Sequence, residues 1–251
     1  MELGLINVVR KKIEELVPVA PISISLDQPL MSVTFDDFPR SAWLETKDLL
    51  HDCEVKATFY VSGSFVGRTI DSIDFYKEED LAEVDENGHE IGCHTYYHES
   101  CVLHSLGRLG ESVEKNIEYV RDVIGRYEPT AFAYPYGHSL LASRHMLSRR
   151  FLTCRGVSRQ WDTRVYDRSL VPSIGLEKRR RHLNDWNTIL ESVAHHRGWL
   201  TIFTHDVSAH PSEYGCTQSE LHRLIQLARS YGYGFATMTE AYRLLAGNRS
   251  M

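Results

Sequence analysis

The stretch HEIGCHTYYH (residues 89–98) runs from a short β-rich segment into two histidines, His94 and His98, which stand four positions apart. In parallel α/β folds the reactive side chains lie at the carboxyl ends of strands, on the loops that follow. Two imidazoles at positions i and i+4 of a helical turn can both reach one cation, about 2.0–2.1 Å from each ring nitrogen. We therefore interpret this stretch as a strand that delivers a pair of metal ligands.

Similar β-rich runs alternate with helical segments along the whole chain. The segment at residues 109–125 carries a one-sided apolar stripe, and TQSE at 217–220 is a capping box that opens a helix ending at Gly232. This alternation predicts one α/β domain with a parallel sheet that is closed, or nearly closed, into a barrel. The predicted strands are residues 29–35, 56–61, 89–93, 130–134, 151–156, 169–175, 199–204 and 233–238.

Residues 1–28 are interpreted as a lead-in to the barrel, which we place at residues 29–251. Apolar residues recur in this lead-in at helical spacing and are interrupted by the basic residues 10–12. This pattern predicts an amphipathic helix and not a signal peptide. Its apolar face could pack on the floor of the barrel or on another subunit, and the sequence leaves the oligomeric state open.

Composition and charge narrow the class of protein. A hydrophobic content of 42% and a charged content of 25% are those of a soluble globular protein, and no apolar run approaches the length of a membrane span. The net charge of −6 argues against a nucleic-acid partner. The basic run at 178–181 is interpreted as a solvated loop or helix start, with contact to an anionic substrate as the alternative. Five cysteines without CxxC spacing fit reduced thiols and predict a cytoplasmic location.

Polar residues follow five of the predicted strands, whose ends should meet at one end of the barrel. A carboxylate beside two imidazoles gives a three-ligand metal site with positions left for water, as in catalytic sites. A second carboxylate can take a proton from that water, and a histidine can protonate the leaving amine, so the set predicts amide or ester hydrolysis. The residues are Asp36–Asp37, His94 with His98, Pro135–Tyr136–Gly137, Arg155 and His205–Asp206.

Each of these motifs alone has an ordinary structural explanation. Two histidines four apart are often a solvent-exposed or capping pair, and two aspartates after a strand often cap a helix. A lone histidine such as His205 is usually structural. Their joint occurrence at strand ends favours the catalytic interpretation.

Four segments resemble the successive motifs of polysaccharide deacetylases, the NodB-homology proteins of carbohydrate esterase family 4. They are VTFDD (33–37), HEIGCHTYYH (89–98), FAYPYG (132–137) and IFTHD (202–206), and the resemblance spans roughly residues 30–240. It implies a distorted (β/α) barrel of about seven to eight parallel strands, similar to a TIM barrel.

The same resemblance implies a role for each matching residue. Asp36 would be the general base and His205 the general acid. Asp37, His94 and His98 would hold a divalent metal ion, with zinc favoured and cobalt, manganese or nickel as alternatives. Tyr136 would offer its backbone N–H to the oxyanion, and its ring would shape the acetyl pocket.

Two positions depart from the family pattern. The arginine that usually pairs with the base is replaced by Ala133, and we expect Arg155 on the next strand to supply the guanidinium instead. The aspartate partner of the acid histidine has no clear counterpart, because Asp185–Trp186 are interpreted as the start of a helix.

The sequence therefore predicts a metal-dependent N-deacetylase that acts on an N-acetylated amino sugar. One alternative is a deformylase or amidase of the same fold that acts on a lipid-linked sugar or a small cyclic amide. The other is an inactive member that binds glycan without turnover. The missing signal peptide favours a cytoplasmic glycan precursor over a finished cell-wall polymer.

Overall fold

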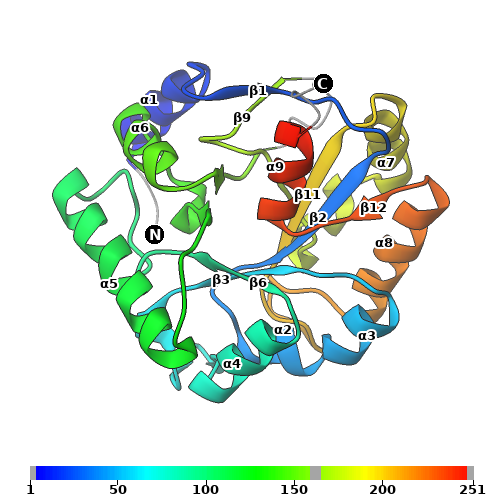
Figure 1. Ribbon diagram of the computed structural model, residues 1–251, viewed down its shortest axis with the longest axis horizontal. Helices are drawn as coiled ribbons and strands as arrows, with labels where there is room; N and C mark the ends of the chain where they lie inside the picture. The colour runs from blue at the N-terminus through cyan, green and yellow to red at the C-terminus, as the bar shows by residue number, and fades with distance from the viewer. Residues whose placement is uncertain (1–3, 159–164, 248–251) are drawn as a thin grey trace.

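A curled parallel sheet forms the centre of the molecule, and helices surround it (Figure 1). The computed structural model describes residues 4–158 and 165–247. The strands follow the order β10-β11-β2-β3-β6-β7-β8, with β12 paired to β2 beside this path, and every pair is parallel. They are β2 (Leu30–Phe35), β3 (Thr58–Val61), β6 (Glu90–Cys93), β7 (Ala131–Ala133), β8 (Thr153–Arg155), β10 (Ile174–Gly175), β11 (Trp199–Thr204) and β12 (Gly234–Phe235).

The two ends of this sheet are joined through residues 171–175. The backbone N–H of Val171 donates to the carbonyl of Cys154 at 2.8 Å, and that of Gly156 donates to the carbonyl of Val171 at 2.9 Å. The same segment continues into β10, which pairs with β11 at the other end of the sheet. The sequence prediction of a distorted barrel of seven to eight parallel strands is confirmed.

Helices form a ring outside the barrel (Figure 1). In α5 the predicted apolar stripe is buried, and α8 opens with the predicted capping box between Thr217 and Glu220. Across the amino ends of the strands lies α9, where Met238 N donates to Thr58 Oγ1 at 3.1 Å. The helices are α1 (Leu5–Glu15), α2 (Arg40–Leu44), α3 (Lys47–Asp52), α4 (Glu78–Glu86), α5 (Leu106–Ile124), α6 (Leu141–Arg150), α7 (Trp186–His195), α8 (Gln218–Ser230) and α9 (Met238–Gly247).

Several short elements were not predicted from the sequence. Strand β1 (Pro21–Ser23) pairs antiparallel with β9 (Val165–Asp167), and β4 (Thr69–Ile70) forms a hairpin with β5 (Ile73–Asp74). The predicted strand 169–175 is too long, since only Ile174–Gly175 are extended as β10. Short 3-10 helices are η1 (Gly63–Phe65), η2 (Pro135–Gly137) and η3 (Lys178–Leu183).

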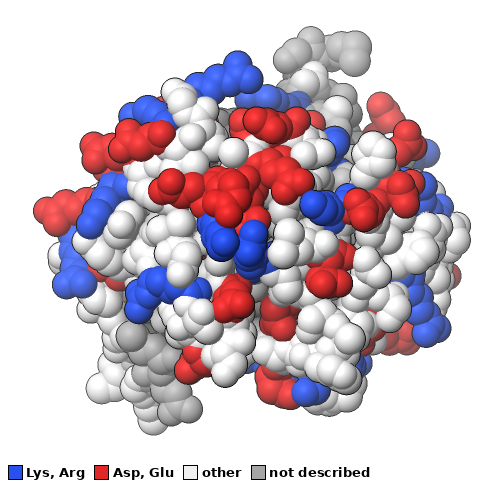
Figure 2. Space-filling view, turned by 90° about the horizontal axis from the view of Figure 1, so that it is seen from below, with Lys and Arg blue, Asp and Glu red and all other residues white. Residues whose placement is uncertain are grey.

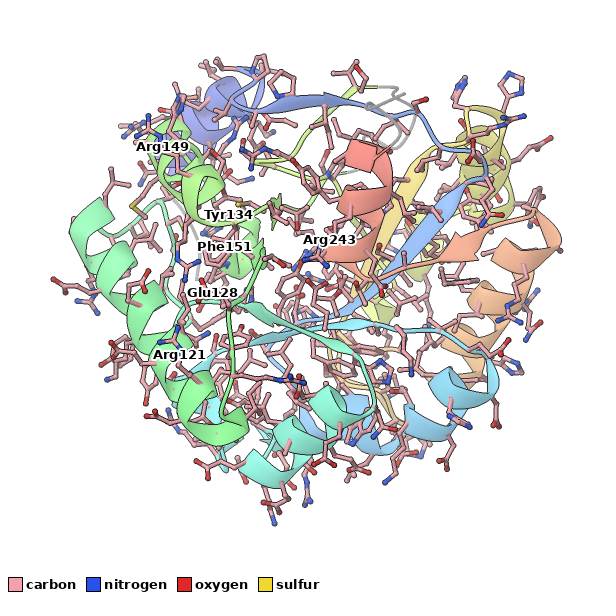
Figure 3. All side chains as sticks on the ribbon, in the orientation of Figure 1. Arg121, Glu128, Tyr134, Arg149, Phe151 and Arg243 are labelled. Carbon is pink, nitrogen blue, oxygen red and sulfur yellow. The ribbon has the colours of Figure 1, made fainter. Side chains whose placement is uncertain are left out.

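Aromatic side chains fill much of the interior. The ring of Phe59 stacks on Phe35 with centroids 4.7 Å apart and also contacts Phe38 and Trp43. Farther along the same face of the sheet, Phe132 packs between Tyr134 and Phe151, with ring centroids 5.2 Å apart in each pair. Tyr134 and Phe151 are labelled in Figure 3. All five cysteines are buried and free, as predicted.

The outer surface over α2, α3 and α4 carries acidic and basic side chains side by side (Figure 2). Ion pairs link these helices, including Arg40 with Asp80 at 2.8 Å and Lys47 with Glu83 at 3.2 Å. Among residues 4–158 and 165–247, no helix combines the length and the apolar character needed to cross a bilayer.

Phe59→Ala should lower the free energy of unfolding by about 3–5 kcal/mol, because it removes a ring enclosed by three other aromatic side chains. Urea denaturation followed by circular dichroism measures this loss. Leu244→Ala is the control, since Leu244 is 50% exposed on α9 and its loss should change stability by no more than about 0.5 kcal/mol. Equal losses in the two variants would contradict the packing described here.

Candidate active site

The carboxyl end of β2 carries the two aspartates at the centre of the barrel mouth. The backbone N–H of Asp36 donates to the carbonyl of Thr204 at the end of β11, at 2.9 Å. The next residue, Asp37, has a φ of 63° and turns the chain out of the strand direction. The two carboxylates therefore point in different directions and contact different residues.

The carboxylate of Asp37 meets both imidazoles of the HTYYH segment. Its Oδ1 lies 3.4 Å from His94 Nε2 and 3.1 Å from His98 Nε2, and one ligand atom from each residue falls within 4.8 Å of the others. The same Oδ1 is buried and has no hydrogen-bond partner. A buried acceptor without a partner is costly, so this atom is suited to a cation shared with the two rings. The donor set of two nitrogens and one oxygen fits a divalent metal ion.

The protonation state of His94 suits a ligand. Its Nδ1 lies 2.8 Å from the carbonyl of Ala133, an acceptor that fixes the hydrogen on Nδ1 and leaves Nε2 free for a metal. Burial lowers the pKa of His94 to about 4, so the ring is neutral at physiological pH. Burial raises the pKa of Asp37, but the adjacent His98, His94 and His205 outweigh it and hold this pKa below its ordinary value.

The loop that holds the two histidines is not the helical turn predicted from the sequence. Thr95 and His98 have φ values of 61° and 53°, and residues 94–98 form an irregular bend. The bend is fixed by side chains, because Glu99 N donates to Thr95 Oγ1 at 3.1 Å and Tyr96 N donates to Ser112 Oγ at 3.0 Å. Both imidazoles nevertheless turn toward Asp37, so a shared cation position does not depend on the helical turn and stays a prediction.

Backbone strain gathers around this site. Of nine non-glycine residues with positive φ in the described parts of the chain, five lie at or beside the Asp37–His94–His98 cluster. Such conformations cost of order 1–3 kcal/mol each and persist where the surroundings enforce them, often at functional sites. The five are Asp37, Phe38, Thr95, His98 and Tyr136.

Asp36 forms a buried ion pair with Arg155. Both carboxylate oxygens accept from Arg155 Nη2, at 2.7 and 2.6 Å. The guanidinium is fully buried between the rings of Tyr60 and Phe203, and its Nη1 donates to Ser173 Oγ. Arg155 is the register partner of Ala133 in β7, so the expected replacement of an arginine at position 133 is geometrically possible.

The remaining predicted residues line the same mouth. The ring of Tyr136 lies 4.5 Å from that of His98, and the side chain is 43% exposed. His205 Nε2 lies 3.9 Å from Asp37 Oδ2. His205 follows β11 and Tyr136 follows β7, and these strands lie on opposite sides of β2 in the sheet. In contrast, Asp206 does not join the cluster, because it accepts from Ser212 N and Oγ and so holds its own loop.

One charged neighbour of His205 was missed from the sequence. Glu177 follows β10, its side chain is fully buried, and its Oε1 lies 3.8 Å from His205 Nδ1. Its charge is also paired with Arg179 and Arg180 of η3. The strand-end rule could have found Glu177, but the basic run that follows it drew the interpretation toward a solvated loop. Asp185 caps α7, as predicted.

Comparison with known proteins identifies the family. A family model described as polysaccharide deacetylase matches residues 24–149, half of the chain. The chain belongs to the polysaccharide deacetylase family. The matched part of this family member includes Asp36, Asp37, His94 and His98, whereas Arg155 and His205 lie beyond it.

Individual relatives support the same assignment. Chitin deacetylase 1 of Saccharomyces cerevisiae is 29% identical over 158 residues, which are 63% of this chain and 47% of that protein. The chain covers between 21% and 47% of the length of the curated relatives that it matches.

Two solved structures share the fold of this chain. A family 4 acetyl xylan esterase from Clostridium thermocellum, in complex with a cobalt ion, has a TM-score of 0.57 and 23% identity, and the match covers 86% of this chain and 91% of that one. Peptidoglycan deacetylase PdaC from Bacillus subtilis has a TM-score of 0.57 and 19% identity, with 90% and 96% covered.

Asp37→Ala and His98→Ala should each lower the affinity for zinc by more than about 100-fold. Substituting a residue that only supports a metal ligand typically lowers the affinity by roughly 10–100-fold, and removing a ligand itself should have a larger effect. Each of the two substitutions removes one of three donor atoms that face a common point. Isothermal titration of metal-free protein with Zn²⁺ measures the affinity.

His138→Ala is the matched control for this titration. His138 packs against Tyr136 in the same mouth, but its Nδ1 is bonded to Ser100 Oγ and does not face Asp37. It should bind zinc as the unmodified protein does. Unchanged zinc affinity in Asp37→Ala would show that the metal, if bound, lies elsewhere.

Proposed function

We propose that this chain is a metal-dependent N-deacetylase that removes the acetyl group from an N-acetylated amino sugar of a polysaccharide or glycan precursor. The observation that carries the proposal is the convergence of Asp37, His94 and His98 on one point beside a second, separately held carboxylate, Asp36. Relatives named for chitin and for peptidoglycan support an amino-sugar polymer as the substrate class.

The metal would be held by Asp37, His94 and His98. A divalent ion there, zinc by preference and cobalt, manganese or nickel as alternatives, would supply a Lewis acid that polarises the amide carbonyl and acidifies water. Every other part of the reaction falls to side chains and backbone groups of the chain.

Asp36 is placed to act as the general base. It takes a proton from the attacking water as the water oxygen bonds to the carbonyl carbon of the acetamide. Arg155 holds both carboxylate oxygens from one side and so fixes the orientation of the base. The backbone N–H of Tyr136 is proposed to donate to the oxyanion, and the exposed ring of Tyr136 to form one wall of the acetyl pocket.

His205 completes the reaction as the general acid. When the carbon–nitrogen bond breaks, the leaving amine takes a proton from His205, and the products are acetate and the free amino sugar. Glu177 lies on the Nδ1 side of this ring and is proposed to orient it.

The same residues would also serve the alternative reactions. Deformylation of a lipid-linked sugar or opening of a small cyclic amide needs the same metal, base and acid. An inactive glycan-binding protein would have no need for this complete set, which disfavours that alternative. We also propose a cytoplasmic location, supported by the five free, buried cysteines.

Acetate release from acetylated chito-oligosaccharides should be abolished by a chelator and restored by Zn²⁺. Asp36→Asn should lower kcat by a factor on the order of 10²–10⁴, because it removes the proton acceptor but leaves the three proposed ligands in place. Metal content should stay at the level of the unmodified protein.

Asp185→Asn is the matched carboxylate-to-amide control, since asparagine caps a helix as well as aspartate does. It should leave the rate unchanged. If the chain releases formate from a formylated sugar but no acetate from an acetylated one, the proposed activity is deformylation and not N-deacetylation. Full activity in Asp36→Asn would move the base to another residue.

Glu177→Gln should lower kcat by a factor on the order of 10–100, because the carboxylate that faces His205 Nδ1 at 3.8 Å no longer orients the proposed acid. Steady-state kinetics of acetate release measures this loss. Glu213→Gln is the control, because Glu213 pairs with Lys178 on the exposed rim and should leave kcat unchanged. The same kcat in all three proteins would remove Glu177 from the proposed mechanism.

A further inference from the structure

Helix α1 turns its apolar side toward solvent. None of its residues is buried, although the apolar stripe of a surface helix usually faces the core. Its large apolar side chains remain strongly exposed in the folded chain. They are Leu5 (78% exposed), Ile6 (83%), Val9 (48%), Ile13 (60%) and, just after the helix, Leu16 (75%).

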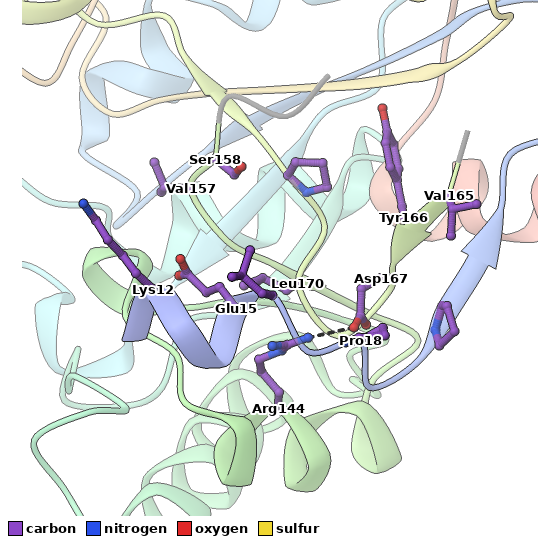
Figure 4. A pocket seen from close by; sticks show the side chains of 13 residues that line it. Lys12, Glu15, Pro18, Arg144, Val157, Ser158, Val165, Tyr166, Asp167 and Leu170 are labelled. Atoms are coloured by element: carbon purple, nitrogen blue, oxygen red, sulfur yellow. Dashed lines mark hydrogen bonds and ion pairs between the residues drawn. The ribbon is translucent and has the colours of Figure 1, made fainter. Parts of the chain in front are cut away.

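Polar contacts hold α1 in this orientation. Glu14 Oε2 accepts from Leu141 N at the start of α6, and the Glu14 carbonyl accepts from Arg144 Nη1 at 2.8 Å. Arg144 also donates to the carbonyl of Val17 and to Asp167 Oδ2 (Figure 4). The helix is therefore attached to the barrel by its polar side and its C-terminal end.

Basic residues stand on both edges of the exposed stripe. With about 100° between successive residues, the five apolar side chains occupy an arc of about 100°. Lys12 lies about 20° beyond one edge of this arc and Arg10 about 40° beyond the other. Apolar residues bordered by lysine and arginine are the pattern of helices that lie in the interface of a bilayer, with the basic side chains directed to the headgroups.

We propose that α1 binds the surface of a bilayer that contains anionic lipids. Leu5, Ile6, Val9, Ile13 and Leu16 enter the boundary between headgroups and acyl chains. Lys12 contacts the lipid phosphates, and Arg10, which pairs with Glu14 at 2.7 Å in the free chain, contacts them through its remaining N–H groups. This binding does not depend on the proposed deacetylase chemistry.

A second copy of the chain fits this face less well. An 11-residue helix is about 16 Å long, too short to bury by itself the roughly 800 Å² per partner of a stable dimer. Two copies of α1 packed antiparallel about their centres would also bring Arg10 and Lys12 of one helix toward the same basic residues of the other. Like charges oppose such a pair, whereas anionic lipid attracts both residues.

The position of α1 relates the bilayer to the active site. The helix contacts the start of α6, which follows β7 at the carboxyl end of the barrel. A cavity of about 230 Å³ lies between the helix and Val157 and Ser158, which follow β8 (Figure 4). Glu14 binds the first residue of α6, directly after the loop that carries Tyr136 and His138. A chain bound through α1 would thus hold this side of the site mouth near the lipid, where a lipid-linked sugar could reach it.

Co-sedimentation with vesicles tests the proposal. The full chain should sediment with vesicles of equal parts phosphatidylglycerol and phosphatidylcholine, and at least about tenfold less with phosphatidylcholine alone. The double variant Val9→Glu/Ile13→Glu should lose this binding. Arg10→Gln/Lys12→Gln should weaken binding to the mixed vesicles only.

Leu244→Glu is the matched control, because Leu244 is also an exposed leucine on a helix but lies on α9 at the opposite end of the barrel. It should sediment as the unmodified chain does. The proposal is wrong if the chain binds neither kind of vesicle, or if the Val9→Glu/Ile13→Glu variant binds as well as the unmodified chain. Light scattering that shows a dimer abolished by this variant, without vesicle binding, would assign the face to contact between copies. No substrate is present in these measurements, so their outcome is independent of whether acetate is ever released.

Discussion

The ion pair between Arg155 and Asp36 spans the inside of the barrel. Arg155 belongs to β8 and Asp36 follows β2, and three strands separate β8 from β2 along the sheet. The contact can form only because the sheet curls until its ends meet, so barrel closure and site assembly are the same event. Breaking a buried pair of this kind typically costs about 3–5 kcal/mol, because it leaves one charge buried without a partner.

The Asp37–His94–His98 cluster next to this pair is held by a different means. Short loops, not helices or strands, orient His94 and His98, and several of their residues adopt left-handed backbone conformations. Hydrogen bonds that the loop donates to Ser112, and one within the loop itself, compensate for this strain. The barrel on one side and the strained loops on the other bring three donor atoms near one point. Such preorganisation reduces the rearrangement needed on binding.

Much of this arrangement followed from the sequence, because the signals were local and strong. The eight strands of the barrel stand out as β-rich runs between helical segments, and the strand-end rule identified Asp36, Asp37, Arg155 and His205. Strands β1 and β9 escaped notice because they are three residues each and pair across more than half of the chain. The loop at 94–98 was wrongly predicted to be a helical turn. Two histidines four residues apart can face one point from a helical turn or from an irregular bend, and the spacing does not distinguish the two. Glu177 was missed because it stands next to the basic residues 178–181, and a run of charged residues in a sequence is usually exposed to solvent. In the folded chain the Glu177 side chain is buried. The outward-facing stripe of α1 depends on tertiary contacts that no local pattern reveals.

The register between β7 and β8 couples two positions of the interior. Ala133 and Arg155 are direct neighbours on adjacent strands, and both are completely buried. A second guanidinium at position 133 would overfill the interior beside the first. The small side chain of Ala133 is therefore the steric counterpart of Arg155, and the space beside Asp36 accommodates one guanidinium group and not two.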